Sequence, residues 1–222
     1  MTLLAPNCSF CIIAGRPVFL DVSRDLYFEL SAQDEQIFMA LIDGEAVTSD
    51  RQKALIDRGI LSVEDGRPLV PASSPAVCSS ALEGFDGLAK RRWALLPEVG
   101  AILFAYRQTL KSPGGLDRLL RRFRWQKLAA GTASHTPANE LTRVYELVQT
   151  FTALRPFIPI NTICLLDSLS MFEFLRRRQI WATLVFGISH RPFSAHCWLQ
   201  VGGTVLNDAA GYVRSRTTIL TV

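Results

Sequence analysis

The chain has 222 residues, of which 49% are apolar and 20% are charged, and its formal net charge is +4 at pH 7. This composition is typical of an ordinary globular protein, with length for one large domain or two small ones. The modest charge, with no basic stripe interleaved with aromatic residues, does not favour nucleic-acid binding. No apolar run is long enough to cross a bilayer and the N-terminus lacks a charged signal-peptide start, so we expect a cytoplasmic protein without a membrane segment. Five cysteines, an odd number, favour a reducing compartment over a disulfide framework.

The N-terminal part is predicted to contain three short strands, then two helices and a small wing. Ser31 and Asp34 have a spacing similar to that of a capping box, which places a helix start directly after the third strand. The strands are expected over residues 8–13, 17–22 and 26–30, the first helix from 31 to 44, the second from Thr48 or Ser49 to Gly59, and the wing at 60–63 and 69–70.

Cys8 and Cys11 have the C-x-x-C spacing found in metal and redox sites. No second cysteine pair follows, and no βαβ pattern surrounds them. We therefore interpret both as residues of the first strand.

The middle of the chain is predicted to be a linker followed by helices. Residues 68–80 contain three prolines and four serines, which is typical of a linker. Apolar residues at helical spacing then predict helices over residues 95–110, 116–130 and 141–151, with a break at 131–137. The second of these helices carries five cations, which we interpret as a solvated face that could also meet an acidic peptide or partner enzyme.

The C-terminal part contains a cysteine, a histidine and an aspartate in that order: Cys164, His196 and Asp208. Asn161 or Thr162 is expected to cap a buried helix whose first turn holds Cys164. Strands are predicted at 180–188, 195–201 and 204–207, with a turn at 189–194 and a Gly202-Gly203 hairpin. This pattern places His196 and Asp208 on adjacent antiparallel strands packed against the helix of Cys164.

These three residue types are the ones that nucleophilic thiol chemistry requires. A thiol near its free pKa is mostly protonated, so an imidazole must hold it as thiolate, and a carboxylate then fixes the imidazole's tautomer. The N–H of Cys164, at a helix start, is a plausible oxyanion donor. Two other interpretations are structural packing of the three residues and a metal site that also uses Cys197, but no pair has zinc-finger spacing, so we expect no metal.

Four motifs of the C-terminal part resemble one family: Cys-Leu-Leu-Asp-Ser-Leu at 164–169, Arg-Arg-Arg-Gln-Ile at 176–180, Phe-Gly-Ile at 186–188 and Pro-Phe-Ser-Ala-His-Cys-Trp-Leu at 192–199. Together they resemble the lasso-peptide biosynthesis B proteins, over roughly the last 130 residues. The resemblance implies a leader peptidase with Cys164, His196 and Asp208 as catalytic residues. Where the family usually has a small residue after the histidine, this chain has Cys197, which should point away from the site because alternate strand residues face opposite sides.

The resemblance also implies a fold and a domain arrangement. The expected class is α/β (α+β), with an N-terminal winged-helix-like recognition domain in residues 1–75 and a transglutaminase/papain-like cysteine protease domain in residues 81–222. The N-terminal part is similar to precursor-recognition domains, in which a leader peptide adds a strand to the third strand and lies against the last helix. The leader-binding residues implied here are Tyr27, Phe28, Glu29, Leu30, Arg51, Leu55 and Arg58, although one helix of the family pattern is missing.

The partners implied are the leader region of a lasso precursor peptide and an asparagine-synthetase-like lasso cyclase. The chain has no phosphate-binding loop of the P-loop type, so we expect no cofactor, and any ATP dependence should come through the cyclase. Two other functions are left open by the residues. One is a transglutaminase-like acyltransferase that uses the same three residues, and the other is a non-catalytic peptide-binding module.

Overall fold

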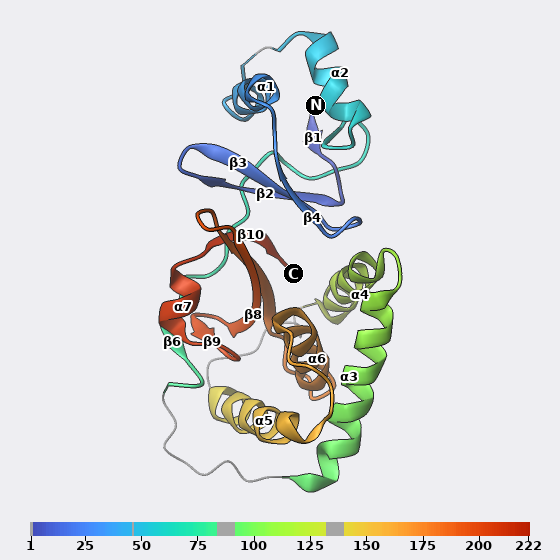
Figure 1. The fold of residues 1–222 in the computed structure, drawn as a ribbon, viewed down its shortest axis with the longest axis vertical. Coiled ribbons are helices and arrows are strands. Elements are labelled where there is room, and N and C mark those ends of the chain that lie inside the picture. The colour runs from blue at the N-terminus through green and yellow to red at the C-terminus, as the bar shows by residue number, and fades with distance from the viewer. Residues whose placement is uncertain (1, 46, 84–91, 132–139) are drawn as a thin grey trace.

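The computed structural model describes residues 2–45, 47–83, 92–131 and 140–222 (Figure 1). Its combination of helices with two main sheets confirms the expected α/β class. A three-stranded antiparallel sheet, ordered β2-β3-β4, lies in the N-terminal part, and a five-stranded sheet, ordered β10-β7-β8-β9-β6, lies in the C-terminal part beside four long helices. Most of the predicted break at 131–137 lies outside the described residues.

The N-terminal sheet is formed as predicted, and two helices cover one of its faces. Rings of Phe10, Phe19 and Phe38 meet in the core between them, with centroids 4.8 Å apart for Phe19 and Phe38 and 5.0 Å apart for Phe10 and Phe38. Ser31 caps the first helix by accepting a hydrogen bond from the N–H of Asp34 at 3.2 Å, as the capping-box spacing indicates. The elements are β2 Cys8–Ile13, β3 Arg16–Asp21, β4 Leu26–Glu29, α1 Ala32–Ile42 and α2 Ser49–Asp57.

The predicted wing is wrong in its pairing. Strand β5, Leu61–Ser62, pairs antiparallel with a strand that was not predicted, β1 at Leu3–Leu4, and residues 69–70 form no strand. The reason is burial, because Leu4 and Leu61 both belong to the N-terminal core. The turn around Gly66 instead returns the chain so that Arg67 can pair with the backbone of Leu4.

The other face of the N-terminal sheet packs against the C-terminal part. Cys11, Val18 and Leu20 alternate with the residues that face α1 and α2, and they belong to the same apolar core as the C-terminal helices. The hydroxyl of Ser9 also donates to the carbonyl oxygen of Ile219 in β10, Thr217–Thr221. The two parts are therefore joined by a shared core, and the division at residues 75 and 81 stays a prediction.

The predicted linker over residues 68–80 is tied down along its length. The N–H of Ala72 bonds to the carbonyl oxygen of Phe10 at 2.8 Å, which covers the outer edge of β2. The side chain of Gln200 donates to the carbonyl oxygen of Pro75 at 3.0 Å. The last two residues of the predicted linker form β6, Ser79–Ser80, which pairs parallel with β9 and completes the C-terminal sheet.

The predicted helices of the C-terminal part are confirmed to within a few residues, and α6 lies between the other helices and the sheet (Figure 1). Beyond the strands expected from sequence, the structure adds the short helix α7 and the edge strand β10. The remaining bounds are η1 Trp93–Leu95, α3 Leu96–Lys111, α4 Gly115–Ala130, α5 Leu141–Leu154, η4 Arg155–Phe157, α6 Cys164–Arg176, β7 Thr183–Ser189, β8 Ser194–Val201, β9 Thr204–Val205 and α7 Ala210–Arg214.

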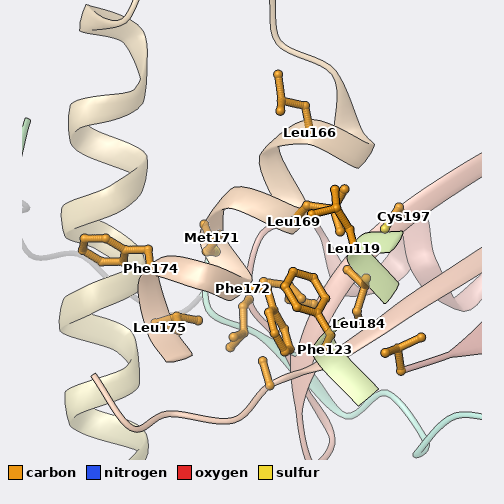
Figure 2. Packing of buried hydrophobic residues seen from close by; sticks show 14 of the residues in the cluster. Leu119, Phe123, Leu166, Leu169, Met171, Phe172, Phe174, Leu175, Leu184 and Cys197 are labelled. Carbon is orange, nitrogen blue, oxygen red and sulfur yellow. The ribbon is translucent and has the colours of Figure 1, made fainter. Parts of the chain in front are cut away.

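Helix α6 is buried on nearly all sides, as its sequence predicts. Figure 2 shows its apolar residues among those of α4 and the sheet, with Phe123 of α4 next to Phe172. These two ring centroids lie 4.2 Å apart. Arg176 and Arg177, at the C-terminal end of α6, interact favourably with the helix dipole. Both also donate hydrogen bonds to the buried carboxylate of Glu173.

Among the described residues, no helix combines the length and the apolar character needed to cross a membrane.

The α4–α6 contact is expected to hold much of the C-terminal core together. Phe123→Ala should lower the free energy of unfolding by about 3–5 kcal/mol, because it leaves a cavity beside Phe172 and Tyr106. Phe104→Ala, on the neighbouring helix α3 where the ring is 57% exposed, should change it by less than about 0.5 kcal/mol. Urea unfolding of both variants measures this, and equal losses would contradict the packing described here.

Candidate active site

Cys164 is the first residue of α6, where the prediction placed it in the first turn. The N-cap, however, is Ile163, and neither Asn161 nor Thr162 caps the helix. The chain is held here by a side chain from an earlier segment. Arg155 is almost fully buried and donates to three carbonyl oxygens, those of Ile158, Ile160 and Asn161, at 2.9–3.3 Å.

Arg155 also anchors the first turn of α6 through an ion pair. Its Nε lies 2.7 Å from Oδ1 of Asp167, three residues after Cys164. Burial raises the pKa of Asp167, and the hydrogen bond from Arg155 opposes that rise. Four of the five guanidinium N–H groups are thus used within the chain, and Arg155 ties the segment that precedes Cys164 to the first turn of α6.

His196 lies on β8 and contacts Asp208 through its Nε2, which bonds to Oδ2 of the carboxylate. The prediction that both lie on adjacent strands is wrong for Asp208. Strand β9 ends at Val205, and Asp208 lies in the segment between β9 and α7, where the N–H of Ala209 donates to its Oδ1 at 2.7 Å. The other imidazole nitrogen, Nδ1, is left for Cys164.

Cys164 and His196 shift each other's pKa in the directions that favour an ion pair. The pKa of the Cys164 thiol is lowered, chiefly by a hydrogen bond with the His196 imidazole and against the effect of burial, with further bonds from the N–H groups of Cys197 and Leu165. The pKa of His196 is raised by the same contact with Cys164, although burial opposes it, and the hydrogen bond to Asp208 adds to the rise. This arrangement favours thiolate and imidazolium together.

Aromatic rings fix the imidazole from two sides. Trp198, two residues along β8, stacks near the ring at a centroid distance of 6.3 Å, and Tyr212 of α7 meets it edge-on at 5.1 Å. Gly187 is paired with His196 across the sheet, and a Cβ there would lie 2.6 Å from the Trp198 ring. Only glycine leaves room for this tryptophan.

A cavity of about 390 Å³ opens onto the three residues. Its walls include apolar side chains of Leu82, Phe151 and Met171 and the backbone segment that carries Thr162. Such a largely apolar cavity with a few convergent polar groups is typical of a ligand site. It has the size to take a few side chains of an extended peptide.

Cys197 points into the core, as the alternation along the strand predicts. Figure 2 shows it beside Leu169 and Leu184, and burial raises the pKa of its thiol well above the usual range. In the described part of the chain no group of three or more His, Cys, Asp or Glu side chains could hold a metal ion. Cys8 and Cys11 belong to different cores on opposite faces of β2, and burial raises their pKa values to about 11 and about 12.

Six of the seven residues implied for leader binding separate into three groups. Phe28, Glu29 and Arg58 line a groove of about 480 Å³ between β4 and the end of α2. Arg51 is exposed on α2 but lies outside this groove. Leu30 and Leu55 are 4% and 0% exposed in the N-terminal core, so their side chains are not available to a peptide in this structure.

Strand β4 has a free edge among the described residues, and its hydrogen-bonding groups can be assigned. In an antiparallel sheet the backbone N–H and C=O groups of successive residues point alternately to one neighbouring strand and to the other. The N–H of Val22 bonds to Asn7 on the β2 side, so the backbone groups of Phe19 point to β4, where Phe19 pairs with Phe28. The N–H and C=O groups of Tyr27 and Glu29 therefore face outward. An incoming strand would pair with these two residues.

The side chains of Tyr27 and Glu29 are occupied by the loop between β7 and β8. Tyr27 contacts the ring of Phe193 with centroids 5.5 Å apart, and a carboxylate oxygen of Glu29 lies 3.6 Å from Nδ1 of His190. Burial raises the pKa of Tyr27, with further contributions that include the nearby thiols of Cys197 and Cys164. The third strand thus lies close to the candidate catalytic residues.

Three residues important to this geometry were not singled out by the sequence: Arg155, Ser168 and Asn207. Arg155-Pro156 was interpreted only as the connection between the third predicted helix and Cys164, and Ser168 only as one of the residues on the buried faces of its helix. A signal existed for Ser168, because a polar residue on a helix that is apolar all round must be hydrogen-bonded.

Comparisons with known proteins find partial similarities in sequence. Residues 114–221 match the sequence model of the transglutaminase-like superfamily. A stretch of 46 residues is 46% identical to the microcin J25-processing protein McjB of Escherichia coli, and it covers 21% of this chain and 22% of the length of that protein. No solved structure matches the chain.

The thiolate–imidazolium pair is expected to show in the pH dependence of Cys164 alkylation. In the wild-type protein, iodoacetamide should label Cys164 with a midpoint below the ordinary thiol pKa, because the imidazole stabilises the thiolate. His196→Ala removes the largest stabilising contact and leaves burial, so the midpoint should move to higher pH. Peptide mapping by mass spectrometry separates Cys164 from the exposed Cys78, and an unchanged midpoint would contradict the pairing.

Proposed function

We propose that this protein is a cysteine peptidase that hydrolyses the bond between leader and core of a lasso precursor peptide. The observation that carries the proposal is the convergence of Cys164, His196 and Asp208 on one cavity, with the pKa of the thiol lowered and that of the imidazole raised. The match of residues 114–221 to the transglutaminase-like superfamily and the partial match to McjB support the same reaction class.

In the proposed reaction the Cys164 thiolate attacks the scissile carbonyl carbon. The carbonyl oxygen becomes an oxyanion, which the N–H of Cys164 at the start of α6 is positioned to stabilise. His196 then gives its Nδ1 proton to the leaving amine of the core peptide as the C–N bond breaks. Water, deprotonated by His196, hydrolyses the thioester and releases the leader as a free acid. Asp208 holds Nε2–H of His196 throughout and steadies its positive charge.

The leader is proposed to bind along β4. Its main chain would pair with the outward-facing groups of Tyr27 and Glu29, and its side chains would enter the groove lined by Phe28 and Arg58. This edge lies beside the loop that precedes His196, so a leader bound there could present its C-terminal end to Cys164. The asparagine-synthetase-like cyclase remains the proposed partner, supplying any ATP dependence, and we propose a cytoplasmic location because the precursor is made by ribosomes there.

Acyl transfer to an amine is the second candidate, because the superfamily match fits it equally well. A non-catalytic peptide-binding module is a weaker alternative. Packing alone needs neither a lowered thiol pKa nor a carboxylate on the far side of the imidazole.

Product analysis distinguishes hydrolysis from transfer. Wild-type protein with the precursor encoded beside its gene and the cyclase should release leader whose new carboxylate carries heavy oxygen from ¹⁸O-labelled water. Cys164→Ala should bind the precursor and release none, since the thioester cannot form. An amine adduct of the leader in place of the acid would establish the transferase, and cleavage at the wild-type rate by Cys164→Ala would show that the nucleophile is misassigned.

Strand addition at β4 is tested by a proline at a position whose N–H faces outward. Glu29→Pro should weaken leader binding roughly two- to tenfold, because one hydrogen bond is worth about 0.5–1.5 kcal/mol. Glu29→Ala is the matched control, since it also loses the contacts with Arg16 and His190 but keeps the N–H. Fluorescence polarisation with a labelled leader compares them, and equal affinities for the two variants would argue against pairing at this edge.

A further inference from the structure

A chain of buried hydrogen bonds joins α6 to the sheet directly behind the candidate catalytic residues. The hydroxyl of Ser168 donates to the carbonyl oxygen of Cys197 at 2.9 Å and accepts a hydrogen bond from Nδ2 of Asn207 at 2.8 Å. The carbonyl oxygen of the Asn207 side chain accepts the N–H of Leu199, also at 2.8 Å. These hydrogen bonds thus join α6 to β8 and to the segment that follows β9.

Asn207 explains why the chain leaves the sheet where it does. The last backbone bond between the two strands joins the N–H of Leu206 to the carbonyl oxygen of Leu199 at 2.8 Å. At the next position the side chain of Asn207 takes the place of a backbone acceptor for Leu199. The backbone is thereby free to turn away from β8, and the turn brings Asp208 to His196.

Each member of this hydrogen-bond chain is adjacent to a candidate catalytic residue. Ser168 lies one helical turn after Cys164 on the same face of α6, because residues four apart are neighbours on a helix. Cys197 directly follows His196, and Asn207 directly precedes Asp208. Three segments that are far apart in the sequence therefore meet through one serine hydroxyl and one amide.

From this arrangement we propose that Ser168 and Asn207 form a positioning pair that sets Cys164, His196 and Asp208 in register for catalysis. Ser168 is fully buried and does not line the cavity, whereas Asn207 lies at its wall. In this scheme both side chains act through the groups to which they bond, and neither takes part in the bond-breaking steps. The inference rests on the proposed peptidase function. It adds the requirement that α6, β8 and the segment between β9 and α7 be held together by polar contacts as well as by apolar packing.

Because these hydrogen bonds are buried, losing one of them is costly in free energy. Ser168 is 0% exposed, and a buried hydrogen bond cannot be exchanged for one with water when it is lost. Removal of the hydroxyl would leave the carbonyl oxygen of Cys197 and the amide of Asn207 without this partner. Those groups would shift to find others, and β8 and the Asp208 segment would move relative to α6.

The same helix offers a matched control two residues further on. Ser170 is also 0% exposed, but its hydroxyl has no hydrogen-bond partner among the described residues. Ser168→Ala and Ser170→Ala therefore remove the same atom from equally buried positions on one helix. They differ in whether that atom joins the helix to the sheet.

The test is the pH profile of Cys164 alkylation in the full-length protein, with iodoacetamide as probe and peptide mapping as readout. Ser168→Ala and Asn207→Ala should each lower the labelling rate at pH 7 by about tenfold or more, which corresponds to a rise of about one unit in the thiol pKa. Ser170→Ala should keep the wild-type profile. The double variant Ser168→Ala/Asn207→Ala should lose no more than either single one, because the two residues act as a unit.

Thermal unfolding of all four variants separates positioning from stability. If Ser168→Ala fails to fold, Asn207→Ala alone decides the matter, since Asn207 is partly exposed in the segment after β9. Wild-type profiles in the folded Ser168 and Asn207 variants, or independent losses that add in the double variant, would overturn the pair. A wild-type protein whose Cys164 titrates as an ordinary thiol would instead contradict the proposed function.

Discussion

The candidate active site depends on an incomplete antiparallel ladder. Strand β9 pairs with β8 over only two residues, so the N–H groups of Cys197 and Leu199 point into space that no strand fills. The N-terminal end of α6 lies against this edge. One N–H group contributes to lowering the pKa of the Cys164 thiol, and the other is taken by the side chain of Asn207. A longer β9 would satisfy both groups with backbone carbonyls and would carry Asp208 along the strand, away from the imidazole that it contacts. The short strand is therefore what allows a helix, a strand and a turn to meet at one cavity.

The cysteines of this chain show how strongly nearby hydrogen-bond donors affect the pKa of a thiol. Cys8, Cys11 and Cys197 are buried among apolar groups, and burial raises the pKa of each. Cys164 is also partly buried, yet its pKa is lowered because the imidazole and two backbone N–H groups surround the sulfur. Burial and hydrogen bonding act in opposite directions on the charged form, and at Cys164 the hydrogen bonds prevail. Cys197 is the informative contrast, since it follows His196 in sequence but points into the apolar core (Figure 2).

Much of this architecture could be predicted from local sequence patterns, and the failures have a common cause. Helices with clear apolar periodicity were placed to within a few residues, and Cys164 was correctly placed at the start of its helix, because these features depend on neighbours in the sequence. Ser79–Ser80 carry no strand pattern and become a strand only by pairing with Thr204–Val205. The same holds for Asp208, whose place is fixed by the side chain of the preceding Asn207. Leu30 and Leu55 were assigned to a peptide surface because the resemblance to precursor-recognition domains implied it, and a resemblance does not show which side chains this chain buries.

The shared core between the two parts has a consequence for how the chain folds during synthesis. The inner face of β2 and β3, with Val18 and Leu20, is part of a core completed by residues from the far end of the chain, including Ile219 and Leu220. The N-terminal sheet can form its own strand pairs as soon as it leaves the ribosome, but one of its faces stays open until β10 has been made. Contacts of such sequence separation close slowly, because a long loop must be ordered first. We therefore expect the nascent chain to expose an apolar surface through most of its synthesis, a state that favours aggregation or chaperone binding until β10 has been made.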